Sequence, residues 1–213
     1  MSSCCAQGYS KVFGERQARR DARRFRRKGL DGTGQRIVDE LTARGIDGAS
    51  LLEVGGGVGA IDIELLHAGA DRAQIVELSH GYDVEAEKLT AEAGFQGRVE
   101  RLVADFAETE ADIDPADVVV MHRVVCCYPD PEALVGAATR HARRLLALTF
   151  PKDRWWTRLG FWVGNLWYRN VHGFEAYIHP PATILGVARS SGLQPIHEHT
   201  GLFWQLAVFE RNS

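Results

Sequence analysis

The sequence has few of the features that mark secreted, membrane-spanning or zinc-binding proteins. Its four cysteines stand in two adjacent pairs, Cys4–Cys5 and Cys126–Cys127, which make neither a disulfide framework nor a C-x-x-C zinc spacing. The N-terminus carries no apolar signal-peptide stretch, and the longest mostly apolar run, residues 159–168, is too short to cross a bilayer. A net charge of −3 gives no general reason to expect nucleic-acid binding. These absences predict a soluble protein of the reducing cytoplasm.

What the sequence does contain is an alternation of short apolar runs with helical patterns. We predict strands at 50–54, 74–78, 99–104, 116–121 and 144–150, helices at 58–68, 83–93 and 131–143, and a short turn or helix at 107–112. This alternation is typical of a parallel α/β sheet with both faces covered. Two further extended runs, 193–199 and 202–210, have the spacing of an antiparallel hairpin. We therefore predict a doubly wound, seven-stranded α/β fold of the Rossmann-like kind.

A strongly basic segment precedes this pattern. Between Arg16 and Lys28 there are seven arginines and one lysine, and three less polar residues recur at helical spacing, Ala18, Ala22 and Phe25. The pattern predicts an amphipathic helix with one narrow apolar stripe. We favour a solvated basic face over the core. Two alternatives stay open, namely contact with a substrate carboxylate or phosphate, and peripheral contact with an anionic membrane.

An aromatic-rich insert, residues 152–180, separates the fifth strand from the last helix. Its apolar residues share one helical face: Trp155, Trp156, Leu159, Trp162, Val163, Leu166 and Trp167. Such residues commonly pack in a core, and the alternative is a lid over a large, apolar or planar substrate. We predict one domain over residues 1–213. Its parts are a helical N-terminal cap (1–45), a core (46–151 and 181–213) and the insert as a substrate lid.

A glycine cluster lies between the first predicted strand and its helix, in Glu53-Val-Gly55-Gly56-Gly57-Val-Gly59-Ala60. Glycines let the backbone approach a ligand closely, and the following helix offers unpaired N–H groups at its N-terminus. Gly55, Gly57 and Ala60 also fit the G-x-G-x-x-G/A pattern of dinucleotide-binding proteins. The stretch therefore predicts a site for a nucleotide-like ligand.

Two acidic residues at the ends of later strands narrow the ligand class. Glu77 ends the second predicted strand, where a carboxylate can accept both hydroxyls of a ribose. Asp105 follows the third strand and can accept from the exocyclic amine of adenine, next to Phe106, although an aspartate there can also cap a helix. Together they indicate a ligand that contains adenosine.

These motifs and the terminal hairpin resemble the class I S-adenosylmethionine-dependent methyltransferases over about residues 45–213. The resemblance implies that S-adenosylmethionine is the cofactor. It implies that the glycine loop (Glu53, Gly55, Gly56, Gly57 and Gly59) holds the amino-acid end. Glu77 with Leu78 would hold the ribose, and Asp105 with Phe106 the adenine. A nicotinamide-dependent dehydrogenase, the rival interpretation, does not explain Asp105 or the hairpin.

A nearer resemblance is to the magnesium-protoporphyrin IX methyltransferase group and its relatives. It rests on residues 121–129 after the fourth strand, on Thr149-Phe-Pro-Lys152, and on Tyr177-Ile-His-Pro180. These signals do not assign a porphyrin substrate.

The acceptor pocket of a doubly wound sheet lies beyond the carboxyl ends of the strands. We therefore predict His122 as a catalytic base or as a contact of the cofactor, since histidine titrates near neutral pH. Seven residues are predicted to bind the acceptor: Arg123, Cys127, Tyr128, Trp155, Trp156, Tyr177 and His179.

The sequence thus predicts a metal-independent methyltransferase that acts on a small, hydrophobic or polycyclic acceptor, with O-methylation favoured. After the fourth strand the chain lacks the Asp/Asn-Pro-Pro-Tyr/Phe element that the amino-group methyltransferases of adenine and glutamine typically carry. His122-Arg123 also does not supply the Asp and Asn set of the metal-dependent catechol type. Two alternatives stay open: a protein that binds the cofactor without transferring methyl, as a cyclase or a regulatory module, and an RNA methyltransferase that uses the basic segment.

Overall fold

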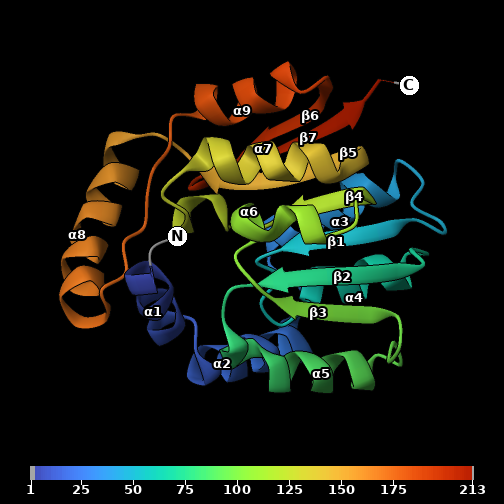
Figure 1. The fold of residues 1–213 in the computed structure, drawn as a ribbon, viewed down its shortest axis with the longest axis horizontal. Coiled ribbons are helices and arrows are strands. Elements are labelled where there is room, and N and C mark those ends of the chain that lie inside the picture. Colours follow the sequence, from blue (N-terminus) through green and yellow to red (C-terminus); the bar gives the residue numbers. More distant parts are fainter. Residues whose placement is uncertain (1–2, 213) are drawn as a thin grey trace.

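One seven-stranded sheet runs through the molecule, with helices on both of its faces (Figure 1). The computed structural model describes residues 3–212. The strand order is β3-β2-β1-β4-β5-β7-β6. The strands are β1 (Ser50–Val54), β2 (Arg72–Glu77), β3 (Val99–Val103), β4 (Ala116–Met121), β5 (Ala142–Pro151), β6 (Leu193–Thr200) and β7 (Trp204–Arg211). The first five pair in parallel, and β7 runs antiparallel between β5 and β6. The predicted fold class is confirmed.

The alternation of side chains along each strand divides the core into two layers. One layer joins Leu51, Val118 and Leu145 to the helices α3 (Gly32–Thr42), α4 (Ala60–His67) and α5 (Asp83–Glu92). The other joins Leu52, Val119 and Leu146 to the helices α6 (Phe106–Thr109), α7 (Pro131–His141) and α9 (Pro181–Ser190). Because successive residues of a strand point to opposite faces, the central strands carry apolar residues on both faces.

Several boundaries differ from the prediction by one or two residues, and two of them show why. The helix predicted at 131–143 ends at His141, because Ala142 already pairs with Ala116 and begins β5. The second strand begins at Arg72, two residues early, where Ser50 of β1 is its partner. In both places the pairing with a neighbouring strand decides where the strand begins. The local sequence does not show that pairing.

The N-terminal segment forms α1 (Ser3–Val12) and α2 (Glu15–Lys28), and the insert forms α8 (Trp155–His172). In Figure 1, α1 lies between α2 and α8, at the carboxyl ends of the parallel strands. Ala18 and Ala22 of α2 are fully buried against the core, so the predicted narrow apolar stripe is confirmed. Among the described residues, no helix combines the length and apolar character needed to span a bilayer.

Candidate functional site

The glycine loop between β1 and α4 has a backbone that only glycine adopts readily. Gly55, Gly57 and Gly59 have φ angles of 70°, 54° and 74°. A Cβ atom on Gly55 would lie 2.7 Å from Cγ2 of Val124, which belongs to the loop after β4. Both the left-handed conformation and this close approach therefore require a residue without a side chain.

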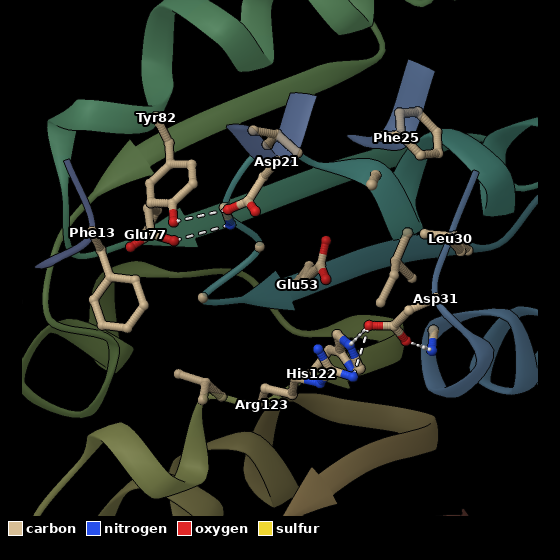
Figure 2. A pocket seen from close by; sticks show the side chains of 18 of the residues that line it. Phe13, Asp21, Phe25, Leu30, Asp31, Glu53, Glu77, Tyr82, His122 and Arg123 are labelled. Carbon is tan, nitrogen blue, oxygen red and sulfur yellow. Dashed lines mark hydrogen bonds and ion pairs between the residues drawn. The ribbon is translucent and has the colours of Figure 1, made fainter. Parts of the chain in front are cut away.

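A cavity of about 230 Å³ lies against this loop (Figure 2). It brings together six of the predicted cofactor residues and contacts from both N-terminal helices. Its lining includes Glu53, Gly55, Gly56, Gly57, Glu77 and His122, with Arg123 and Cys127, and also Tyr9, Asp21, Asp31 and Tyr82. The predicted Gly59 is the residue that precedes α4 and does not line the cavity.

Glu53 lies fully buried at the end of β1, beneath the loop. Its Oε2 atom has no hydrogen-bond partner in the described structure, and a Cβ on Gly56 would lie 2.8 Å from it. Neither carboxyl oxygen of Asp62, in α4, has a partner either. Burial and the neighbouring Asp62 raise the pKa of Glu53, and burial raises the pKa of Asp62 to about 6. The pair thus holds a proton near neutral pH.

Glu77 is the best-satisfied carboxylate of the site. Its Oε2 accepts from the N–H of Gly57 at 3.0 Å, and its Oε1 accepts from the N–H groups of Leu78 and Ser79 at 2.8 and 3.2 Å. The hydroxyl of Tyr9, from α1, also donates to Oε1 at 3.2 Å. Burial raises the pKa of Glu77, and burial with the neighbouring Glu77 raises that of the Tyr9 phenol. Glu77 therefore links the glycine loop to the N-terminal cap.

Tyr9 stands where three cavities meet. It lines the cavity at the glycine loop and a cavity of about 30 Å³ that contains the predicted Leu78, Asp105, Phe106 and Tyr128. It also lines a third cavity, of about 260 Å³, together with Cys127, Tyr177 and Arg169. Cys127 is shared by all three as well. Tyr9 and Cys127 thus border all three cavities, which one extended ligand would need to be continuous.

Asp105 has the capping role that the sequence left open, and it also borders the second cavity. Its side chain accepts from the N–H of Ala107 at 3.2 Å and so caps α6. The hydroxyl of Tyr128 donates to its Oδ2 at 3.4 Å. Phe106 is buried, with its ring 5.2 Å from that of His141. The predicted adenine residues therefore lie together at the end of β3.

His122 is held on both sides of its ring. Its Nδ1 lies 3.2 Å from the hydroxyl of Thr149, and its Nε2 lies 3.8 Å from Oδ2 of Asp31 (Figure 2). Burial lowers the pKa of His122, although Asp31 acts against this shift. Burial alone would raise the pKa of Asp31, but bonds from His122 and Gly34 and the charge of Arg123 bring it well below its usual range.

Arg123 joins this group through an unusual backbone. It is the one non-glycine residue with a positive φ, 60°, in the described chain, and its N–H donates to Thr149 at 2.9 Å. Its guanidinium lies 2.7 Å from Asp31 and sits over the ring of Trp204, 4.9 Å from the centroid. Strained backbone of this kind concentrates at functional sites.

Neither a protein-family model nor a curated protein matches this sequence. Solved structures do match. Magnesium protoporphyrin IX methyltransferase from Synechocystis PCC 6803 with bound SAH is 23% identical, covering 89% of this chain and 93% of that chain, with a TM-score of 0.68. The structure of the same protein with bound SAM is 22% identical, covering 89% of this chain and 90% of that chain, with a TM-score of 0.64. An O-methyltransferase family protein from Burkholderia thailandensis is 22% identical, over 85% of this chain and 57% of that chain, with a TM-score of 0.67.

This chain has the methyltransferase fold. The strand order and the antiparallel terminal hairpin agree with that assignment.

On this methyltransferase fold, four of the predicted acceptor residues gather at the end of β4. Cys127 and Tyr177 line the third cavity. The backbone N–H of Tyr177 donates to the carbonyl of Cys126 at 2.7 Å, and Nε2 of His179 lies 2.9 Å from the carbonyl of Tyr128. The segment after α8 is thereby fastened to the loop after β4.

Trp155 and Trp156 are not brought to the site. They are 72% and 36% exposed at the start of α8, and neither lines any of these cavities. The predicted helix is present, but its aromatic face turns outward. The core-packing interpretation of that face is therefore wrong, and the lid interpretation stays a prediction.

Tyr9 and Asp31 are among the site residues that escaped prediction. Each belongs to the N-terminal cap, which only the folded chain brings to the site. Asp31 also caps α3, accepting from the N–H groups of Thr33 and Gly34, and that role is the one its sequence context indicates. The thiols of Cys126 and Cys127 lie 3.8 Å apart, while the side chains of Cys4 and Cys5 lie outside the described residues. Among the described side chains, no group of three or more His, Cys, Asp or Glu is placed to hold a metal ion.

Proposed function

We propose that this protein is an S-adenosylmethionine-dependent methyltransferase. The observation that carries the proposal is the row of carboxylates at the ends of β1, β2 and β3, Glu53, Glu77 and Asp105, around a left-handed glycine loop on the methyltransferase fold. The bound SAH and SAM of the Synechocystis protein support the same cofactor class.

The residues present fit the polar groups of this cofactor. Glu53 Oε2 is buried without a partner in the described structure, and the ammonium of the cofactor's amino-acid end would supply one. Glu77 would accept from the ribose hydroxyls, and Asp105 from the adenine amine, with Leu78 and Phe106 beside it. When bound, the cofactor supplies an electrophilic methyl group on a positively charged sulfur.

His122 is better suited to positioning than to removing a proton. A neutral imidazole has one donor and one acceptor nitrogen. The Thr149 hydroxyl accepts from Arg123, so its own proton is available for Nδ1 of His122, and the Nε2 proton then points to Asp31. No lone pair of His122 is left for a substrate. The depressed pKa of Asp31 makes that carboxylate a weak base as well.

A site without a ready base favours an acceptor that is already ionised. A carboxylate oxygen needs no deprotonation near neutral pH, and transfer would then depend on alignment and exclusion of water. The cavity of about 260 Å³ offers aromatic walls from Phe174 and Tyr177 and the guanidinium of Arg169, which suits a planar apolar acid. We therefore propose O-methylation of a small hydrophobic or polycyclic acceptor, through a carboxylate.

Calorimetry with SAH tests the cofactor. We expect the wild type to bind, and Glu53→Gln and Asp105→Asn to bind at least about tenfold more weakly, because each removes a charge-assisted bond. The exposed Glu87→Gln on α5 is the matched control and should bind as the wild type does. A wild type that does not bind SAH overturns the proposal.

The acceptor is tested with methyl-labelled S-adenosylmethionine and a panel of planar aromatic carboxylic acids and phenols. Mild alkali releases methanol from a methyl ester but not from a phenol ether, so the stability of the labelled product identifies the oxygen. Transfer to phenols alone contradicts the carboxylate assignment.

A second candidate function rests on the same His122 geometry. A protein that binds the cofactor without transferring methyl needs no base and no acceptor cavity. SAH binding with no labelled product from any acceptor, together with unchanged SAH affinity in Arg169→Ala and Tyr177→Phe, would favour it.

A further inference from the structure

Helix α8 exposes an apolar surface that the rest of the described chain leaves uncovered. Eight of the eleven exposed large apolar side chains belong to this helix, and Thr157 is its one buried residue. Trp162 and Trp167 are 61% and 57% exposed. Contiguous exposed apolar surface of this kind marks an interaction site in a soluble protein.

The exposed face lies opposite the side by which α8 is attached. Asn165 bonds the backbone of Ala176 in both directions, at 2.8 and 2.9 Å, and the ring of Tyr168 packs against Phe174. At 3.6 residues per turn, the eight exposed apolar residues cover an arc of about 180° centred on the other side. Figure 1 shows α8 at the outer edge of the molecule, with α1 beside it.

The tip of the β6–β7 hairpin extends this surface. The backbone N–H of Lys152, just before α8, donates to the carbonyl of Phe203 at 2.7 Å. Phe203 and its neighbour Leu202 are both exposed, Leu202 to 74%. The apolar surface therefore continues from α8 to a second element that is fixed next to its N-terminal end.

The apolar arc of α8 has positively charged side chains along one of its edges. Arg158 and Arg169 follow the same edge of the apolar arc, and no Asp or Glu occurs from Arg154 to Phe174. Both guanidinium groups stay largely exposed, although Arg158 makes a bidentate ion pair with Asp153 at 2.6 and 2.9 Å and Arg169 lies 3.9 Å from Glu175. Tryptophans on an apolar face with arginines at its border are typical of helices that lie in the interface of an anionic bilayer.

A lipid surface also suits the shape of α8 better than a protein partner. None of the cavities described above is lined by a tryptophan of α8, so none of these cavities is placed to hold a partner's side chains against its apolar face. A bilayer accepts a convex apolar helix, and arginine side chains there extend their charged ends to the headgroup phosphates.

We propose that α8, with Leu202 and Phe203, docks this protein on an anionic lipid membrane. The tryptophans of α8 enter the boundary between headgroups and acyl chains, and Arg158 and Arg169 pair with lipid phosphates. This surface is distinct from the basic α2 helix, where the sequence left membrane contact open. It shares Arg169 with the proposed acceptor cavity, but vesicle binding requires no methyl transfer.

Vesicle flotation tests the proposal with full-length protein and vesicles of phosphatidylcholine, with or without 30% phosphatidylglycerol as a chosen composition. We expect the wild type to float with the anionic vesicles and its tryptophan fluorescence to shift to the blue. Trp162→Ser/Trp167→Ser should weaken partitioning at least about tenfold, and Arg158→Gln/Arg169→Gln should abolish the preference for anionic lipid. Circular dichroism and SAH binding report whether the variants stay folded.

The matched control is Arg20→Glu/Arg23→Glu, a double change on the exposed side of α2. It should leave most of the binding in place. Three outcomes overturn the proposal: no binding of the wild type to either vesicle, loss of binding only in the α2 variant, or a dimer in solution that Trp162→Ser/Trp167→Ser converts to monomer. The last would assign the face to a second copy of this chain.

Discussion

Glu53 and Asp62 place two carboxyl groups side by side in the core, directly beneath the glycine loop. Both are fully buried, and the charge of Arg101, whose Nε lies 3.5 Å from Asp83, only partly offsets the rise in their pKa values. Two carboxylates cannot both ionise cheaply in such surroundings, so one of them keeps its proton. A buried cation bound above Glu53 would reverse that preference. The arrangement suits a site for an ammonium group.

This pair makes the stability of the protein depend on pH. Asp62 titrates near pH 4 in an unfolded chain, whereas its pKa in the fold is about 6. The proton it keeps therefore contributes stability that is complete below about pH 4 and is lost as the pH rises through about 6. Asp62→Asn has no proton to lose. We compare the free energy of unfolding of Asp62→Asn with that of the wild type at each pH. The difference, variant minus wild type, should be about 2 kcal/mol larger at pH 7.5 than at pH 4.5.

Urea unfolding of both proteins at the two pH values measures this difference. The exposed Asp114→Asn is the control, with the same chemical change outside the core. Equal effects of Asp62→Asn at both pH values would show that Asp62 is ionised in the folded protein throughout.

At the scale of elements, the glycine loop is defined by its contact with the loop after β4. Gly55→Ala must place a Cβ in left-handed backbone and against Val124, whereas Gly97→Ala meets the same backbone cost with no atom within 4 Å. We expect Gly97→Ala to lower the free energy of unfolding by about 1 kcal/mol and Gly55→Ala by about 3 kcal/mol.

Removing the opposing side chain separates the two costs at Gly55. In the background of Val124→Ala, the change Gly55→Ala should cost only about 1 kcal/mol, as at Gly97. Chemical denaturation of the four proteins completes the cycle. An undiminished cost in the Val124→Ala background would mean that contact with Val124 does not shape the loop.

The strands and their acidic residues could be predicted from the sequence, and the orientation of the helices around them could not. The central strands are apolar on both faces, so each appears as a continuous run, and Glu53, Glu77 and Asp105 stand out because they interrupt or end such runs. The orientation of α8 could not be predicted. Its periodicity defines an apolar face, but the bonds of Asn165 to Ala176 decide that this face turns away from the core. Tyr9 and Asp31 were missed for a related reason, since their partners are distant in the sequence.

At the scale of the whole molecule, α1 connects the surface of α8 to the site. A Cβ on Gly8 would collide with the carbonyl of Gly173 at the end of α8, so the two backbones are in close contact. The next residue, Tyr9, bonds Glu77 and lines all three cavities. The 260 Å³ cavity also includes Arg169 of α8. Membrane docking would thus place an acceptor dissolved in lipid near the entrance of the site.

Tyr9 should compete with the cofactor for Glu77. Its hydroxyl bonds Oε1, the atom that a ribose hydroxyl would need, and its ring lines both of the cavities proposed for the two ends of the cofactor. Tyr9→Phe removes the competing bond from the ligand-free state, which should become less stable by about 1 kcal/mol. SAH should then bind about fivefold more tightly, because a bond of this kind no longer has to be broken first.

Calorimetry with SAH and urea unfolding without it measure the two effects, and amide hydrogen exchange locates them. In the wild type, SAH should protect the glycine loop and speed exchange in α1, since α1 gives up its bond to Glu77. Weaker SAH binding by Tyr9→Phe, with α1 more protected in the complex, would instead mean that the Tyr9 hydroxyl stays in place and bonds the cofactor directly. The two results differ in sign for both measurements, so they decide whether α1 blocks this site or closes over it.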